Sequence, residues 1–228
     1  MTTRSTTTMR SESRTEALNQ SGASHDTLLR WMAVPGFTMF TAVCAQIAFP
    51  MPPYGIPQTL QTLAVLLCAL ALGPLMGSLS MIVYLLAGVV GVGVFAEGES
   101  GWQTIIGQSG GYLVGFILCQ PVAHSIIRRR PSSSEDNRNT FRPRTRTGEF
   151  RGWGAVILAG IAVHAVVFSI GVPWLYFVRS NDALADPLTV WDAIKWGCIA
   201  FLPGMVLKVG IATVLAVIFR PEIARRFW

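Results

Sequence analysis

The sequence has few charged residues and long stretches that contain none. Only 13% of its 228 residues are Asp, Glu, Lys or Arg, about half of the roughly 25% that is usual in soluble domains. Residues 31–96, 100–127 and 152–178 carry no such side chain. A transmembrane helix needs about 20 apolar residues, and a membrane β-barrel would instead show alternating segments of about 10. The pattern excludes a water-soluble protein and a β-barrel, and it predicts a helical membrane protein.

Lysine is nearly absent, since Lys195 and Lys208 are the only two. Neither ends a Gly-x-x-x-x-Gly-Lys loop, which cradles phosphates in common ATPases, so ATP-driven work would require another subunit. The 4 cysteines stand alone in apolar runs, which is typical of buried small hydrophobic side chains. His124 and His164 lie on different predicted helices without further ligands at the same depth. We therefore expect no metal site, no cofactor and no catalytic set of an enzyme.

Turn-forming residues divide the apolar part into six predicted spans. Pro50 to Pro57 is rich in proline, and Gly73-Pro74 marks a tight turn. The fold class expected is therefore an all-α polytopic membrane domain over residues 30–220. Its six helices are expected near 31–49, 57–73, 75–95, 104–127 and 153–178, with a last one that ends near Phe219. Residues 1–29 are predicted to form a disordered tail because they are rich in Ser, Thr and Arg, and 221–228 a short C-terminus.

The charges that remain are strongly asymmetric. Most of the 18 basic residues precede the first span, fill a loop at 128–151 or follow the last span. The positive-inside rule then places both termini and this Arg-rich loop in the cytoplasm of a cell (inner) membrane protein. The loop can also contact anionic lipids of the bilayer. The opposite loops carry acidic residues: Glu97, Glu99, Asp182, Asp186 and Asp192. This topology explains the basic balance without a nucleic-acid partner.

Lys208 is the most informative polar residue in the apolar part. Pro203 and Gly204 are expected to begin a helix, because proline suits a first helical turn, and Lys208 then lies about one turn inside it. An embedded lysine is costly, so it either extends toward the interface, pairs with Glu97 or Asp192, or binds an anionic ligand. We favour the anionic ligand.

Two further polar clusters fall at the same predicted membrane side. Gln108, Ser109 and Tyr112 stand among glycines at the start of the fourth helix, where the glycines themselves favour close helix packing. Thr59 and Gln61 begin the second helix, where Thr59 could instead cap it. Amides, hydroxyls, an aromatic ring and one cation at one side predict a site for a small solute that is part polar and part apolar.

The first helix carries pairs of small residues at four-residue spacing. Thr38, Ala42 and Ala45 lie on one such face. Small residues allow helices to approach closely, so this face could serve a partner helix or packing within the chain. We assign it as a candidate coupling surface.

Several motifs in order resemble those of the BioY family, the biotin-binding S components of energy-coupling factor (ECF) vitamin transporters. They are IPQTLQTLAVLLCALALGP, GSLSMIVYLLAGVVGVGVFA, GQSGGYLVGF, GVPWL and FLPGMVLK, and the resemblance runs from Trp31 to Phe219. It places the family's TLQT at Thr59 to Thr62, its Gly-Gly-Tyr at Gly110 to Tyr112 and its pocket lysine at Lys208. Met205 stands where the family usually has aspartate, which removes one acceptor.

The resemblance implies biotin uptake with a transmembrane coupling protein and two cytoplasmic ATPases as partners. In that reading Lys208 pairs with the valerate carboxylate, and Tyr112 packs against or hydrogen-bonds the bicyclic ring. Gln61, Thr59 and Ser109 serve the ureido group, and the loop at 50–57 closes over the site. The alternatives are an S component for a different small anionic vitamin and a biotin carrier that works alone.

Overall fold

The computed structural model describes residues 28, 31–50, 56–128, 147–182 and 188–227. Within these ranges, the side chains of residues 128, 147–152 and 219–227 are not described. The predicted tail at 1–29, apart from Leu28, most of the Arg-rich loop and the centre of the loop at 50–57 lie outside the described ranges. Helices dominate the rest. They are a first helix at 31–46, α2 (Gln61–Val89), the short α3 (Trp102–Ile106), α4 (Gly110–Arg128), α5 (Thr147–Ser180), α6 (Val190–Gly197) and α7 (Leu202–Phe227).

α2 is a hairpin of two helices rather than one long rod. Gly73 has φ 77° inside it and is followed by Pro74, a left-handed conformation that glycine adopts without steric cost. Gln61 Nε2 donates to the Tyr84 hydroxyl at 2.5 Å, although 23 residues of straight helix would separate them by about 34 Å. The two halves therefore run antiparallel, as the Gly73-Pro74 turn predicted, so the described residues contain six long helical segments: the first helix, the two halves of α2, α4, α5 and α7.

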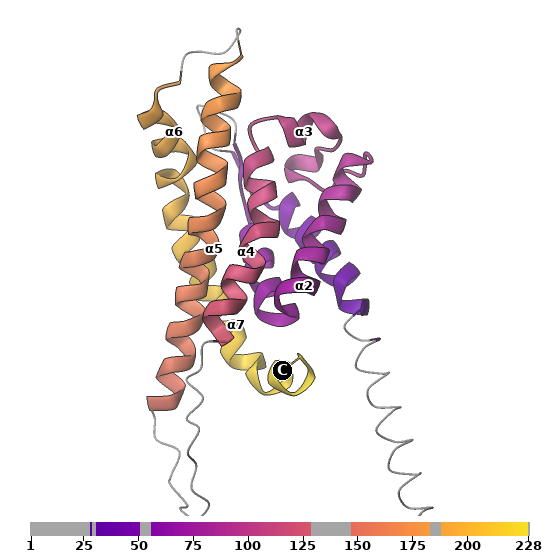
Figure 1. Cartoon of the computed structure of the whole chain (residues 1–228), viewed down its shortest axis with the longest axis vertical. Helices are drawn as coiled ribbons and strands as arrows, with labels where there is room; N and C mark the ends of the chain where they lie inside the picture. The colour runs from indigo at the N-terminus through magenta and orange to yellow at the C-terminus, as the bar shows by residue number, and fades with distance from the viewer. Residues whose placement is uncertain (1–27, 29–30, 51–55, 129–146, 183–187, 228) are drawn as a thin grey trace, which may run out of the picture.

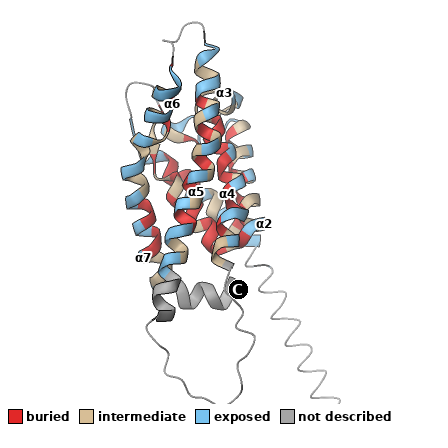
Figure 2. Cartoon of the chain, turned by 60° about the vertical axis from the view of Figure 1, so that its left-hand side comes forward, coloured by how far each residue is buried: buried red, intermediate tan, exposed pale blue. Residues whose placement is uncertain are grey.

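The six segments form one bundle with two chemically different ends (Figure 1). At the basic end the first helix begins, α4 ends at Arg128, α5 begins and α7 ends. The other end, here called the pocket end, carries α3, α6 and the acidic Glu97, Glu99 and Asp192. Among the described residues, four helical stretches are long and apolar enough to cross a membrane when α2 is taken as one and Val190–Ile218, which runs from α6 into α7, as another. Exposed hydrophobic residues cover the outside of the bundle (Figure 2), as expected for a multi-pass membrane protein.

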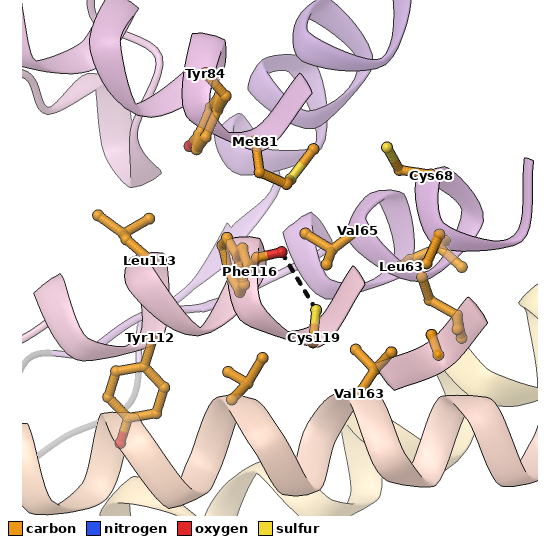
Figure 3. Close-up of a cluster of buried hydrophobic side chains, with 14 of the residues drawn as sticks. Leu63, Val65, Cys68, Met81, Tyr84, Tyr112, Leu113, Phe116, Cys119 and Val163 are labelled. Carbon is orange, nitrogen blue, oxygen red and sulfur yellow. Dashed lines mark hydrogen bonds between the residues drawn. The ribbon is translucent and has the colours of Figure 1, made fainter. Parts of the chain in front are cut away.

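α4 lies at the centre of the core, between α2 and α5. Leu113, Phe116 and Cys119 point from α4 toward α2, whereas Tyr112 points toward α5 (Figure 3). On the α5 side the backbones approach closely, because a Cβ at Gly111 would lie 2.4 Å from Trp174 Cβ. This close approach confirms packing as a role for the glycines of this helix.

Several elements differ from the sequence prediction. The last apolar region contains a separate helix, α6, then a 3-10 turn η2 (Ile199–Phe201) before α7 begins at Leu202. Pro203 lies in the first turn of α7, as predicted, and α7 continues to Phe227 beyond the expected end near Phe219. Residues on either side of the proline-rich loop pair as two short antiparallel strands, β1 (Ala48–Phe49) and β2 (Gln58–Thr59).

Candidate functional site

A pocket opens at the pocket end of the bundle, among the β2 hairpin, α2, α4, α5 and α7. It contains about 840 Å³ of space outside atoms, its open mouth included. Hydrophobic and aromatic side chains form most of its wall. Nine polar side chains also line it, namely Thr59, Gln61, Thr62, Glu97, Glu99, Thr104, Ser109, His164 and Lys208.

The structure brings all five predicted substrate-binding residues to this one pocket. They come from three separate parts of the chain: Thr59 and Gln61 at the start of α2, Ser109 and Tyr112 at the start of α4, and Lys208 in α7. Their convergence follows from the topology, because α2, α4 and α7 all begin at the pocket end of the bundle.

Lys208 supplies the pocket with a buried positive charge. Only 6% of the residue is exposed, and its Nζ donates a hydrogen bond to Thr62 Oγ1 at 3.0 Å. Within the part of the chain that the structure describes, no carboxylate pairs with it. An ammonium with one neutral partner has two remaining donors, and a buried charge is costly without a counter-charge. The site therefore favours a ligand with an anionic or strongly accepting group.

Gln61 is held firmly by its neighbours. Its amide Nε2 donates to the Tyr84 hydroxyl, which in turn donates to Val94 O at 2.9 Å. Its Oε1 accepts from Thr59 Oγ1 at 2.8 Å. This network fixes the amide in one orientation and uses the Thr59 hydroxyl proton, so these groups present a preorganised polar wall.

Tyr112 presents its ring, rather than its hydroxyl proton, to a ligand. The hydroxyl donates to Gly197 O in α6 at 2.8 Å, which ties α4 to the end of α6. Its ring stacks on Phe201 with centroids 6.3 Å apart and planes at 26°. Together the two rings form a flat apolar surface on which a bicyclic group can pack.

The residues that follow the undescribed centre of the proline-rich loop contact the pocket wall. Gln58 Nε2 donates to Phe201 O at 3.4 Å, and Ile56 and Pro57 line the pocket. Residues 51–55 lie outside the described part, so loop closure stays a prediction.

Sequence reasoning missed several residues of this wall. Thr62 was included only as part of a motif, and Phe168, Phe201 and His164 were not assigned to the site. They come from α5 and η2, where a single polar or aromatic residue in an apolar run has no local signal. Met205, one turn before Lys208, packs against the hydrophobic core.

The small residues of the first helix face the interior of the chain. Thr38 Oγ1 donates to Ser80 O at 2.9 Å, and Ala42 and Ala45 are buried, the latter with 0% exposure. Packing within the chain therefore accounts for these three residues, and their role as a coupling surface stays a prediction. The opposite face of this helix exposes Met39 and Val43.

Comparison with known proteins gives one consistent result. The chain is 29% identical to the biotin transporter BioY of Thermotoga maritima over 180 residues, or 79% of this chain and 89% of that one. It is 39% identical to the biotin transporter BioY2 of Lactococcus lactis subsp. cremoris over 183 residues, or 76% and 80% of the two chains.

A crystal structure of the S-component for biotin from an ECF-type ABC transporter has the same fold. It superposes with a TM-score of 0.70 at 19% sequence identity, covering 89% of this chain and 97% of that one. The BioY family model matches residues 14–225, which is nearly the whole chain. With its six-segment bundle and its single pocket-wall lysine, this chain belongs to the BioY family.

Proposed function

We propose that this chain captures biotin for uptake, as the substrate-binding S component of an ECF-type transporter. The observation that carries the proposal is the buried Lys208 ammonium, which has only a neutral partner and lines a small-molecule pocket in a member of the BioY family. Biotin combines one carboxylate with an apolar bicyclic body and a polar ureido group, and the wall offers a cation, stacked rings and the fixed amide of Gln61 for these parts.

Each predicted residue has a defined role in this proposal. Lys208 pairs with the valerate carboxylate in a charge-assisted hydrogen bond. The stacked rings of Tyr112 and Phe201 pack against the bicyclic body. Gln61, Thr59 and Ser109 hydrogen-bond the ureido group, donating to its oxygen and accepting from its N–H groups.

Direct binding to the purified chain tests the proposal. In isothermal titration calorimetry of the detergent-solubilised protein, biotin should bind with a defined stoichiometry. The methyl ester of biotin, which lacks the negative charge, should bind at least about tenfold more weakly, because a charge-assisted contact contributes about 1.5–3 kcal/mol. Absence of biotin binding, together with binding of another small anionic vitamin, would contradict the proposal. Equal affinity for biotin and its ester would remove the carboxylate from Lys208.

The proposal also includes the partners and the orientation. A transmembrane coupling protein and two cytoplasmic ATPases would drive transport, since the chain has no phosphate-cradling loop of its own. Both termini would lie in the cytoplasm, because the basic end of the bundle would face inward. Biotin uptake by cells that express this chain should require co-expression of the ATPase subunits. Uptake by the chain alone would instead indicate a carrier that works without them.

The coupling surface is tested separately. If Thr38, Ala42 and Ala45 contact the coupling protein, Ala42→Trp should abolish uptake while the purified variant still binds biotin. If they serve packing only, the variant should lose thermal stability and biotin binding together, because Ala42 is buried.

A further inference from the structure

His164 is a buried residue of the pocket wall that the proposed function has not used. It lies on α5 and is only 2% exposed. Its Nδ1 is 2.8 Å from the backbone oxygen of Gly160, one turn earlier in the same helix. Its Nε2 is buried and has no hydrogen-bond partner among the described residues. The side chain nevertheless borders the pocket, as Lys208 does.

The contact with Gly160 determines which nitrogen of His164 carries the proton. A backbone carbonyl can only accept, so Nδ1 must donate to it. In a neutral imidazole the other nitrogen then has a free lone pair and no proton. The neutral form suits this site, because the Lys208 ammonium lines the same pocket and the carboxylates that line it, Glu97 and Glu99, are exposed at its mouth. His164 Nε2 is therefore a buried hydrogen-bond acceptor.

Among the polar side-chain atoms of the pocket wall, His164 Nε2 is the one that is buried without a hydrogen-bond partner in the described residues. Gln61 Oε1 already accepts from Thr59, and Met205, one turn before Lys208, has no strong acceptor atom. A buried acceptor without a donor is energetically unfavourable. A ligand that brings a donor to Nε2 would remove this penalty and gain affinity.

The rings beside His164 indicate which part of a ligand reaches it. The His164 and Phe168 rings have centroids 5.9 Å apart, Phe168 and Phe201 are 6.1 Å apart, and Phe201 stacks on Tyr112. These four rings form one continuous aromatic wall from α5 to α4. A bicyclic ligand body that packs along this wall has its polar edge next to His164.

We propose that His164 Nε2 accepts a hydrogen bond from a ureido N–H of biotin and so selects for ligands with a donor at that position. The inference rests on the proposed function, since it takes biotin as the ligand. The ureido group contains the only N–H donors of biotin, so no other part of the molecule can make this bond through nitrogen. His164 is a specificity-determining residue in this account, and Lys208 binds a different group of the ligand.

The test compares biotin with its cyclic carbonate analogue, in which ring oxygens replace both ureido N–H groups. Calorimetry on the full-length protein should show that the wild-type chain binds the analogue at least about tenfold more weakly than biotin. In His164→Phe, which keeps an aromatic ring and removes the acceptor, biotin affinity should fall by a similar factor. Affinity for the analogue should stay unchanged, so the preference for biotin over the analogue should shrink by that factor. His164→Leu, a smaller replacement, should give the same result if the phenylalanine variant does not fold.

His124→Phe is the matched control, because His124 belongs to α4 and does not line the pocket. It should keep the wild-type preference for biotin. If the His164 variants weaken biotin and the analogue equally, or neither, His164 has only a packing role and the inference is overturned while the proposed function stands. If the wild-type chain binds no biotin, both are overturned.

Discussion

Lys208 Nζ donates to Thr62 Oγ1 at 3.0 Å, a contact that joins α7 to α2 across 146 residues of sequence. This hydrogen bond holds the Lys208 side chain against α2, the helix that also carries Gln61. The ammonium is thereby positioned toward the pocket with a partner that balances none of its charge. A ligand acceptor can therefore bind to Lys208 without displacing a protein carboxylate.

Replacing Thr62 should change how strongly ligand stabilises the protein. Thr62→Val keeps the shape of the side chain and removes the acceptor of Lys208. Hydrogen bonds to charged groups contribute about 1.5–3 kcal/mol, so the melting temperature of the ligand-free protein should fall. The rise in melting temperature on adding biotin should become larger, because the ligand then supplies the missing acceptor. Thermal unfolding with and without biotin measures both.

Thr213→Val is the control for this experiment. Thr213 lies on the same helix as Lys208, and its hydroxyl donates to a backbone oxygen of that helix, Val209 O. Its replacement should leave the biotin-induced rise at the wild-type value. An unaltered rise in Thr62→Val as well would show that Thr62 does not position Lys208.

The hydroxyl and the ring of Tyr112 should have separable effects. Tyr112→Phe leaves Gly197 O without its donor, which should lower stability by about 1–3 kcal/mol. The ring remains, so biotin affinity should stay within about threefold of wild type, less than 1 kcal/mol. Tyr112→Ala should reduce affinity by more than about tenfold, because it removes the stacked surface. A large loss of affinity in Tyr112→Phe would instead assign the hydroxyl to the ligand.

The close approach of α4 and α5 should make Gly111 intolerant of substitution. A Cβ at this position would lie 2.4 Å from Trp174 Cβ, so Gly111→Ala should destabilise the protein by about 1–3 kcal/mol through overpacking. Gly210 on α7 has nothing within 4 Å of an added Cβ. Gly210→Ala should therefore leave the melting temperature unchanged or raise it, since alanine favours helix. Equal behaviour of the two variants would contradict the close packing.

The orientation can be checked by labelling single cysteines in intact cells. With the 4 native cysteines replaced, a cysteine at the exposed Asn181, at the pocket end, should react with a membrane-impermeant maleimide added outside. A cysteine at the exposed Ser125, near the basic end of α4, should react only after the cells are permeabilised. The reverse pattern would place the pocket on the cytoplasmic side.

Local backbone chemistry made several parts of the fold predictable. Gly73-Pro74 predicted the turn of the α2 hairpin, and Pro203 predicted the start of α7, because glycine and proline act on the backbone wherever they stand. The charge-free stretches predicted the membrane segments, because a membrane-spanning helix needs about 20 apolar residues in a row. The strands β1 and β2 and the separate helix α6 were missed, since each is short and depends on tertiary contacts.

The candidate site was predictable only where polar residues cluster. Thr59, Gln61, Ser109, Tyr112 and Lys208 stand out in apolar surroundings, and the structure brings them to one pocket. His164 was assigned to no site from the sequence, because its Gly160 contact and unpaired Nε2 exist only in the folded bundle. The small face of the first helix shows the converse, since sequence spacing alone does not separate internal packing from a docking surface.

The most direct test of the account is biotin binding to Lys208→Met, measured by calorimetry beside Lys195→Met. The chain has only these two lysines, and Lys195 lies exposed on α6. Lys208→Met keeps an unbranched side chain and removes the ammonium, so we expect biotin affinity to fall at least about tenfold, while Lys195→Met binds as wild type does. Wild-type affinity in Lys208→Met would contradict the account, because the buried charge would then have no part in binding.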